Sequence, residues 1–245
     1  MPNHVTNELT AGKPILDAIA SGKDAIDFNK IIPRPAIFDC EPSCNVIDWA
    51  RIAVGEVTLT TLGAPTPDPL AAFQSGDYGA ASKRLEQGNI VRLMTKGPFP
   101  KDFNPEDFEN FIACIKSLKE YGYPSWYEWA TANWGTKWNA YETKRVSDTV
   151  VTFQTAWSMP VKVFTALAAK FPIETLRIRW ADEDFGSNVG DITVTGESVV
   201  SGGIIKNDSV AAHKLAMELL HGNAIPDHMI ELPDGKFGYK EDDAA

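Results

Sequence analysis

The chain has 245 residues, of which 44% are hydrophobic and 23% are charged, values typical of a soluble globular protein with a packed core. Its formal net charge of −10 opposes the nonspecific phosphate contacts from which nucleic-acid-binding proteins gain most of their affinity. No run of about 18 apolar residues is present and the first residues lack a secretory signal pattern, so neither a membrane span nor export is expected. Three cysteines do not make a disulfide framework, which favours a reduced, cytoplasmic location.

The first 34 residues predict a β-α-β unit. A short strand over 5–9 precedes an apolar stripe at helical spacing, which Gly22 ends. Residues 26–32, IDFNKII, are predicted to form a second strand, and Pro33 ends it.

Residues 35–145 are expected to be mainly helical. Ser43 suits the N-cap of one helix, and Asn104 followed by proline and two acids suits the start of another. Residues 69–96 are predicted to form short helical pieces between glycines.

Residues 123–141, YPSWYEWATANWGTKWNAY, hold four of the seven tryptophans. Ser125 and Glu128 form a capping box, S-x-x-E, for a short aromatic helix whose Trp126 and Trp129 are expected to be packed in the core.

The end of the same stretch, NWGTKWNAY, favours a turn because of its glycine and asparagines. Trp134 and Trp138 are therefore candidates for contact with a partner protein, since tryptophan is enriched at interface hot spots.

After residue 141 the sequence again shows the alternating pattern of strands, interrupted by two predicted helices. The alternation Val151, Phe153, Thr155, Trp157 predicts a strand over 149–157. Further strands are predicted over 175–181, 192–194 and 199–206, and helices are predicted to begin at Pro160 and Asp208.

Together these patterns predict an α+β protein with a ferredoxin-like, split β-α-β sheet. Residues 1–34 and 146–225 would form this discontinuous domain, and 35–145 would be a large helical insertion between its second and third strands. The strands over 5–9, 26–32, 149–157 and 175–181 would share one antiparallel sheet. Residues 226–245 are predicted to be a polar C-terminal tail.

Several segments resemble a known family. The runs PNHVTNELT, FNKIIPRP, NWGTKWNAY, FQTAWSMPVKVFTALAAKFP and ADEDFGSNVG are similar to Api-type proteins with a ferredoxin-like domain, a family of unknown function encoded by phages, plasmids and genomic islands. The resemblance implies a ferredoxin-like fold and a mobile-element origin, and hence the cytoplasm of a bacterial host. It implies no catalytic residue and no cofactor.

Two groups of residues have the chemistry of metal ligands. Asp182, Glu183 and Asp184 offer the oxygen atoms that hard cations prefer, and a metal-dependent enzyme using these acids is one alternative. Three consecutive acids point in different directions, however, so a solvated loop is predicted. Cys40 and Cys44 lack the second pair of ligands that a structural zinc site needs. No metal and no cofactor are predicted.

The sequence therefore predicts a non-catalytic accessory protein of a mobile element, acting by protein–protein binding as a counter-defence inhibitor of the anti-CRISPR or anti-restriction type. Its partner would be a host or defence-system protein with a basic surface, since this chain is acidic. The alternative is a nucleic-acid-associated protein of replication or transfer, although the aromatic motif of RNA-binding ferredoxin-like domains is absent. The residues predicted to contact the partner are Trp134, Lys137, Trp138, Asn139, Asp182, Glu183 and Asp184.

Overall fold

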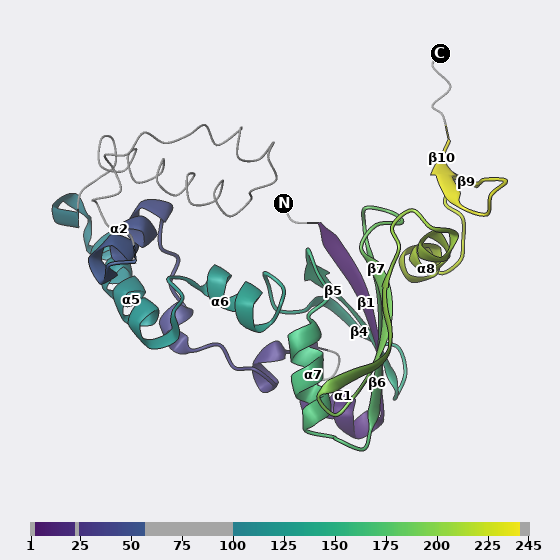
Figure 1. The fold of residues 1–245 in the computed structure, drawn as a ribbon, viewed down its shortest axis with the longest axis horizontal. Coiled ribbons are helices and arrows are strands. Elements are labelled where there is room, and N and C mark those ends of the chain that lie inside the picture. The colour runs from purple at the N-terminus through teal and green to yellow at the C-terminus, as the bar shows by residue number, and fades with distance from the viewer. Residues whose placement is uncertain (1–2, 23–24, 57–99, 241–245) are drawn as a thin grey trace, which may run out of the picture. The chain divides into compact units, whose positions relative to one another are not determined.

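The computed structural model describes residues 3–22, 25–56 and 100–240, and the helices predicted over 69–96 lie outside these ranges (Figure 1). The chain forms two compact units. The first comprises Met1–Arg34 and Ala130–Ala245, and the second comprises Pro35–Trp129. Each unit is described separately below.

The first unit is built around a six-stranded antiparallel sheet in the order β4-β5-β1-β6-β7-β8 (Figure 1). Its strands are β1 (His4–Thr10), β4 (Tyr141–Arg145), β5 (Val150–Ala156), β6 (Thr175–Asp182), β7 (Val189–Thr195) and β8 (Ser198–Ile205). The helices of this unit that pack on the sheet are α1 (Lys13–Ile19), α7 (Val161–Ala169) and α8 (Val210–His221).

Four of the strands form a ferredoxin-like core. The chain runs from β1 through α1 to β4, and β5 lies between these two strands. It then runs from β5 through α7 to β6, and β1 lies between those two. Two interlocked split β-α-β units of this kind define the ferredoxin-like arrangement. The predicted α+β, ferredoxin-like sheet is thus confirmed, and β7, β8 and α8 extend it.

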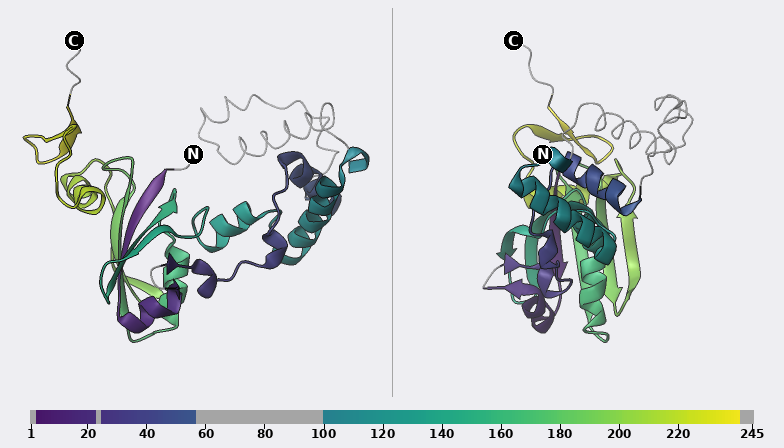
Figure 2. Two further views of the ribbon diagram at one scale, coloured as in Figure 1. Left: turned by 180° about the vertical axis from the view of Figure 1, so that it is seen from behind. Right: turned by 90° about the vertical axis from the view of Figure 1, so that its left-hand side faces the viewer.

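The two faces of the sheet carry different helices: α1 and α7 lie on one side and α8 on the other (Figures 1 and 2). Val5 and Leu9 of β1 are fully buried, and the residues on the other face of this strand are half-buried. Val5 and Leu9 lie on the α7 face, because Phe153 of β5 contacts Phe164 of α7 at 5.9 Å between ring centroids. Burial of each such side chain contributes about 1.5–3 kcal/mol.

The strand predicted over 26–32 is wrong. Only Ala25–Ile26 (β3) are extended, and they pair with Ala20–Ser21 (β2) in a small separate sheet. A 3₁₀ turn over Phe28–Lys30 follows. The reason is local: Asp27 accepts a hydrogen bond from the Asn29 backbone N–H, and Asn29 accepts one from that of Arg34. These side chains therefore compete with a strand ladder for the backbone donors.

The second strand of the core is β4, which the sequence had placed inside the helical segment 35–145. The large insertion therefore precedes the second strand and does not separate the second from the third. β4 was hidden because it is a polar edge strand, YETKR, with alternate residues half-buried and a register irregularity between Tyr141 and Lys144.

The second unit contains α2 (Cys44–Val54) and α5 (Pro105–Tyr121), and α6 (Trp126–Asn133) crosses the boundary between the units. The predicted N-caps are confirmed, since Ser43 and Asn104 each accept a hydrogen bond from the backbone three residues later. α2 and α5 enclose a small core of Val46, Ala50, Cys114 and Leu118. No helix in the described ranges is long and apolar enough to cross a membrane.

Cys114 is expected to resist alkylation in the folded protein. Its side chain is fully buried, and burial, with smaller contributions from Cys40 and Glu128, raises the pKa of its thiol to about 12. Because the thiolate is the reactive form, iodoacetamide at pH 8 should modify exposed Cys44 long before Cys114. Peptide mass spectrometry after timed quenching would measure this order. Equal modification of both cysteines would contradict the burial of Cys114.

The predicted polar tail over 226–245 is partly wrong, because β9 (Met229–Glu231) and β10 (Phe237–Tyr239) form a hairpin. The backbone N–H of Phe237 donates to Nδ1 of His213 on α8 at 3.1 Å. Because Nδ1 accepts this hydrogen bond, the ring proton is on Nε2, which donates to Asp208 at 3.0 Å. Lys236 donates to the other carboxylate oxygen of Asp208 at 2.8 Å. The hairpin is thereby held against α8.

Acid is expected to loosen this hairpin. Hydrogen bonds from Lys236 and then His213 lower the pKa of Asp208 below 3.8, its ordinary value. A depressed carboxyl pKa gives stabilisation that is complete above the pKa of the unfolded state and is lost as the pH falls through the folded-state pKa. The amide NMR signals of β9 and β10 should therefore shift in the window below pH 3.8, and D208N should remove that transition. A transition of equal size in D208N would show that Asp208 is not the group whose protonation loosens the hairpin.

Candidate functional site

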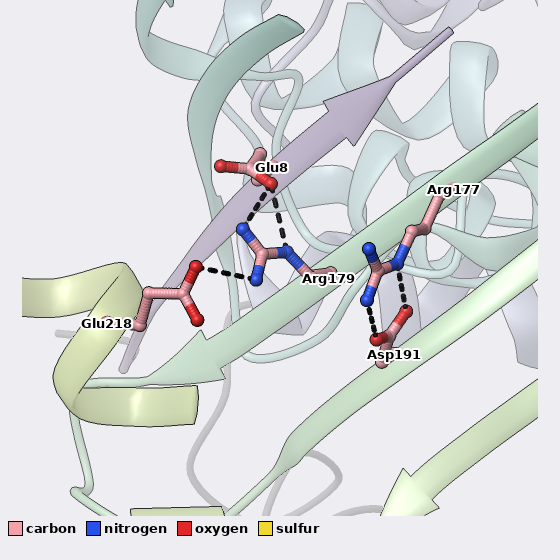
Figure 3. Close-up of polar contacts among 5 residues, drawn as sticks. All are labelled: Glu8, Arg177, Arg179, Asp191 and Glu218. Carbon is pink, nitrogen blue, oxygen red and sulfur yellow. Dashed lines mark hydrogen bonds and ion pairs between the residues drawn. The ribbon is translucent and has the colours of Figure 1, made fainter. Parts of the chain in front are cut away.

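The sheet face that carries α8 holds a network of ion pairs (Figure 3). Arg177 donates from Nε and Nη2 to the two carboxylate oxygens of Asp191, at 3.0 and 2.6 Å. Arg179 donates from the same two atoms to Oε1 of Glu8, at 2.9 and 2.6 Å, and from Nη1 to Glu218 of α8, at 2.8 Å. The strand register places these groups together, because Glu8 lies opposite Arg179 across the β1–β6 pair.

The two arginines differ in burial: the Arg177 side chain is 54% exposed and that of Arg179 is 16% exposed. Hydrogen bonding to Asp191 raises the pKa of Arg177 above its ordinary value. Burial opposes the charge of Arg179, but hydrogen bonds to Glu218 and Glu8 outweigh it, so the pKa of Arg179 is also raised. Both guanidinium groups therefore stay protonated.

A groove of about 610 Å³ lies between this network and α8. Its lining includes charged side chains of both signs, among them Arg177, Arg179, Lys214, Glu218 and Glu231. A ligand entering the groove would meet arginines that are each already paired with a carboxylate. The ion pairs therefore act mainly to join β1, β6, β7 and α8.

A second surface feature, which we call the tryptophan patch, consists of Lys137, Trp138, Tyr141 and Trp157. Trp138 and Trp157 are 37% and 42% exposed, large fractions for tryptophan. The Lys137 ammonium lies 4.9 Å from the ring centroid of Trp138 and 5.0 Å from that of Trp157. Lys137 thus makes cation–π contacts with both indoles.

The tryptophan patch has a fixed support. Trp138 packs edge-on against Tyr141, whose hydroxyl lies 2.6 Å from Nδ1 of His4 and donates to the carbonyl of Thr155. Burial, followed by the charges of Glu183 and Glu142, raises the pKa of Tyr141, so the phenol keeps the proton that it donates.

Trp157 follows the last residue of β5 and turns the chain with φ +70°. Its backbone N–H donates to Asn3, and its carbonyl accepts from Asn188 at 3.0 Å. Both flanking contacts come from other segments of the chain, so the indole is presented from an anchored backbone.

The acidic loop, residues 182–184, lies beside the patch. Asp182 is 4% exposed and accepts hydrogen bonds from Asn3, from Asn188 and from the Asp184 backbone N–H. Glu183 is exposed and accepts from the His4 backbone N–H at 2.9 Å. Since Asn188 bonds both Asp182 and the carbonyl of Trp157, it joins the loop to the patch.

Among the residues expected to contact a partner, three have side chains that bond within the first unit: Trp134, Asn139 and Asp182. Trp134 is 2% exposed, packs edge-on against Phe28 and donates from Nε1 to the carbonyl of Ile32 at 2.8 Å. Asn139 accepts from the Phe28 backbone N–H and donates to Asp27. These contacts lie within the first unit, so Trp134 and Asn139 help to hold its fold together. Asp182 does the same through its asparagine partners, and contact of these three residues with a partner stays a prediction.

Sequence reasoning missed Trp157, Tyr141 and His4 as parts of a surface. Trp157 was expected to continue the buried alternation of β5, but the strand ends at Ala156 and the chain turns outward. The nearby Ser158 and Pro160 were the available signal, because proline ends strands.

Within the described ranges, no three His, Cys, Asp or Glu residues are placed so that they could hold a metal ion. The consecutive acids do not converge, because Asp182 points inward to its asparagine partners while Glu183 and Asp184 are exposed.

Two comparisons find known proteins that are similar to this chain, and a third finds none. Residues 133–221 match a family model described as the ferredoxin-like domain in Api92-like protein. No curated protein matches the chain. Among solved structures, the protein Api92 from Yersinia pseudotuberculosis aligns with 85% of this chain and 100% of its own, at 11% identity and a TM-score of 0.35.

Proposed function

We propose that this chain, which carries the ferredoxin-like domain of Api92-like proteins, acts by binding another protein through the tryptophan patch. The observation that carries the proposal is the pair of exposed indoles, Trp138 and Trp157, on either side of one lysine. Tryptophan and tyrosine bury a large area with little loss of side-chain entropy, which is why they dominate interface hot spots.

The support of the patch favours tight binding. Hydrogen bonds to Asn3 and Asn188 hold the backbone of Trp157, and the ring of Tyr141 backs Trp138. A surface that is ordered before binding loses less conformational entropy on association, so more of its contact energy appears as affinity.

Charge indicates the kind of partner. The chain carries a net charge of −10, and Glu183 and Asp184 are exposed beside the patch. A protein with a basic surface would be attracted at long range and would associate faster at low ionic strength. Nucleic-acid-binding channels of CRISPR and restriction effectors have such surfaces. With the resemblance to mobile-element proteins, this supports a counter-defence inhibitor.

The test compares survival of a phage or plasmid in defence-proficient and defence-deficient bacteria. The gene should raise survival only where the sensitive defence system is present. The double variant Trp138→Ala, Trp157→Ala should lose this effect while keeping the thermal stability of the parent. Tyr239→Ala, which truncates another exposed aromatic residue, is the matched control and should retain it.

Binding to the identified target gives the quantitative form of the test. Trp138→Ala should raise Kd at least about tenfold, mainly through faster dissociation, which corresponds to about 1.4 kcal/mol. Reversing Glu183 and Asp184 to lysine should mainly slow association. Equal survival across a broad panel of defence systems, together with tight binding of the pure protein to DNA or RNA, would instead favour a nucleic-acid accessory role, with the indoles stacking on bases.

A further inference from the structure

The two edges of the main sheet are built differently. β4 is short and irregular in register and carries Glu142, Lys144 and Arg145, features that protect an edge from pairing with other chains. β8, at the other edge, has eight residues and contains neither a charged residue nor a proline. In the part of the chain that the structure describes, no strand pairs with its outer side (Figure 2).

β8 exposes aliphatic side chains along its length: Val199 is 46% exposed, Val200 57% and Ile204 78%. An uncharged strand with these residues at a sheet edge offers both free backbone hydrogen-bonding groups and apolar area to another strand.

A β-bulge determines which way these side chains face. Ser201 pairs with Thr193 and Val199 pairs with Val194, so Val200 is one residue too many on the β8 side. Residues five apart in an unbroken strand face opposite sides. Because of the bulge, Val199 and Ile204 face the same side although they are five residues apart. Val199 lies opposite buried Val194 and Ile204 lies opposite Gly190, both on the α7 face.

Gly202, two residues after Val200, also has a special backbone conformation. It has φ +82°, which favours glycine, and a Cβ there would lie 2.0 Å from the carbonyl oxygen of Asp191. β8 therefore consists of two extended segments, one before the bulge and one after it. The bulge determines which side of the sheet the side chains of each segment face.

We infer that β8 pairs antiparallel with β8 of a second copy of this chain, joining the two sheets edge to edge. In the proposed register, Val199 of one copy lies opposite Ile204 of the other, and Ser198 lies opposite Ile205. Paired residues on neighbouring strands must face the same side, and Val199 and Ile204 do so because of the bulge. The two bulges meet at the twofold axis.

The charges that flank β8 favour a second copy of this chain as the partner of its free edge. The same register places Glu197, which precedes β8, opposite Lys206 of the second copy, and the symmetry repeats this pair at the other end. Both side chains are exposed, and within the described ranges neither forms an ion pair. A net charge of −10 would oppose contact through most surfaces of two copies, whereas β8 is uncharged and its flanks are complementary.

A charge swap tests the register. Sedimentation velocity of the full chain should show a concentration-dependent species of twice 26.9 kDa. Glu197→Lys and Lys206→Glu should each weaken the dimer about tenfold at low salt, because each turns two attractive pairs into two repulsive ones. The double variant should restore the parental dissociation constant. A monomer at all concentrations up to millimolar, or single variants that dimerise like the parent, would overturn the proposal.

Disulfide trapping tests the strand pairing independently. Directly opposed residues on antiparallel strands have Cα atoms about 4.5–5.5 Å apart, within the range that a disulfide spans. In a background with Cys40→Ser and Cys44→Ser, a mixture of Val199→Cys chains and Ile204→Cys chains should form disulfide-linked dimers. Either chain alone should not, because Val199 does not oppose itself. Equal cross-linking of one chain alone, or none in the mixture, would refute the register.

Discussion

Trp134→Ala is expected to lower the free energy of unfolding by about 3–5 kcal/mol, the usual cost of removing a buried tryptophan. The side chain is 2% exposed, packs against Phe28 and donates a hydrogen bond to the carbonyl of Ile32. Its loss leaves a cavity beside Phe28 and leaves the carbonyl of Ile32 without this hydrogen bond. Urea denaturation followed by circular dichroism would measure the change.

Two control variants separate the contributions at this position. Trp134→Phe keeps a ring against Phe28 but loses the hydrogen bond, so it should cost less than the alanine variant. Trp138→Ala, four residues away and 37% exposed, should change the stability by less than about 1 kcal/mol. If Trp138→Ala were as destabilising as Trp134→Ala, the patch would be part of the core and the proposed binding role would fail.

Arg179→Leu is expected to cost about 1–3 kcal/mol, because it leaves Glu8 and Glu218 without the cation that both contact in a half-buried setting. Arg177→Leu is the matched control: it removes a bidentate pair with Asp191, but the arginine is 54% exposed, and exposed pairs contribute about 0–1 kcal/mol.

The same urea denaturation experiment compares the two arginines. A second arm, Arg179→Leu combined with Glu8→Gln and Glu218→Gln, should recover part of the loss, since the carboxylates are no longer left uncompensated. Equal effects of the two single arginine variants would mean that burial does not determine the strength of these pairs.

The strands that the sequence predicted well are those whose two faces differ in polarity. In β6, Leu176, Ile178 and Trp180 face the core, while Arg177 and Arg179 face the ion-pair network. Alternation of this kind is visible in the sequence because burial of one face imposes it.

The failures have equally local causes. Residues 26–32 are apolar enough for a strand, but hydrogen bonds from backbone donors to Asp27 and Asn29 turn the chain there. β4 has little apolar alternation because it lies at an edge. Trp134 is buried and Trp138 is exposed, but both lie in the same glycine-containing stretch. The sequence around them therefore does not distinguish the buried tryptophan from the exposed one.

The tryptophan patch was only half predictable. Lys137 and Trp138 were identified from the turn sequence, whereas Trp157 joins them because β5 ends beside that turn and the 182–188 loop holds its carbonyl. Such a contact depends on strand pairing between distant segments, which local propensity does not encode.

The central position of β1 has a consequence for the synthesis of the protein. Asn7 of β1 bonds Thr155 of β5, a residue 148 positions later, and β1 pairs with β6 still further along. At 5–20 residues per second, roughly 7–30 s pass before the ribosome delivers the first of these partners. Among the described strands, β1 therefore waits longest for its partners, and loop closure over this distance should limit the folding rate of the sheet. During that interval Val5 and Leu9, which are fully buried in the folded sheet, have no strand partners to cover them.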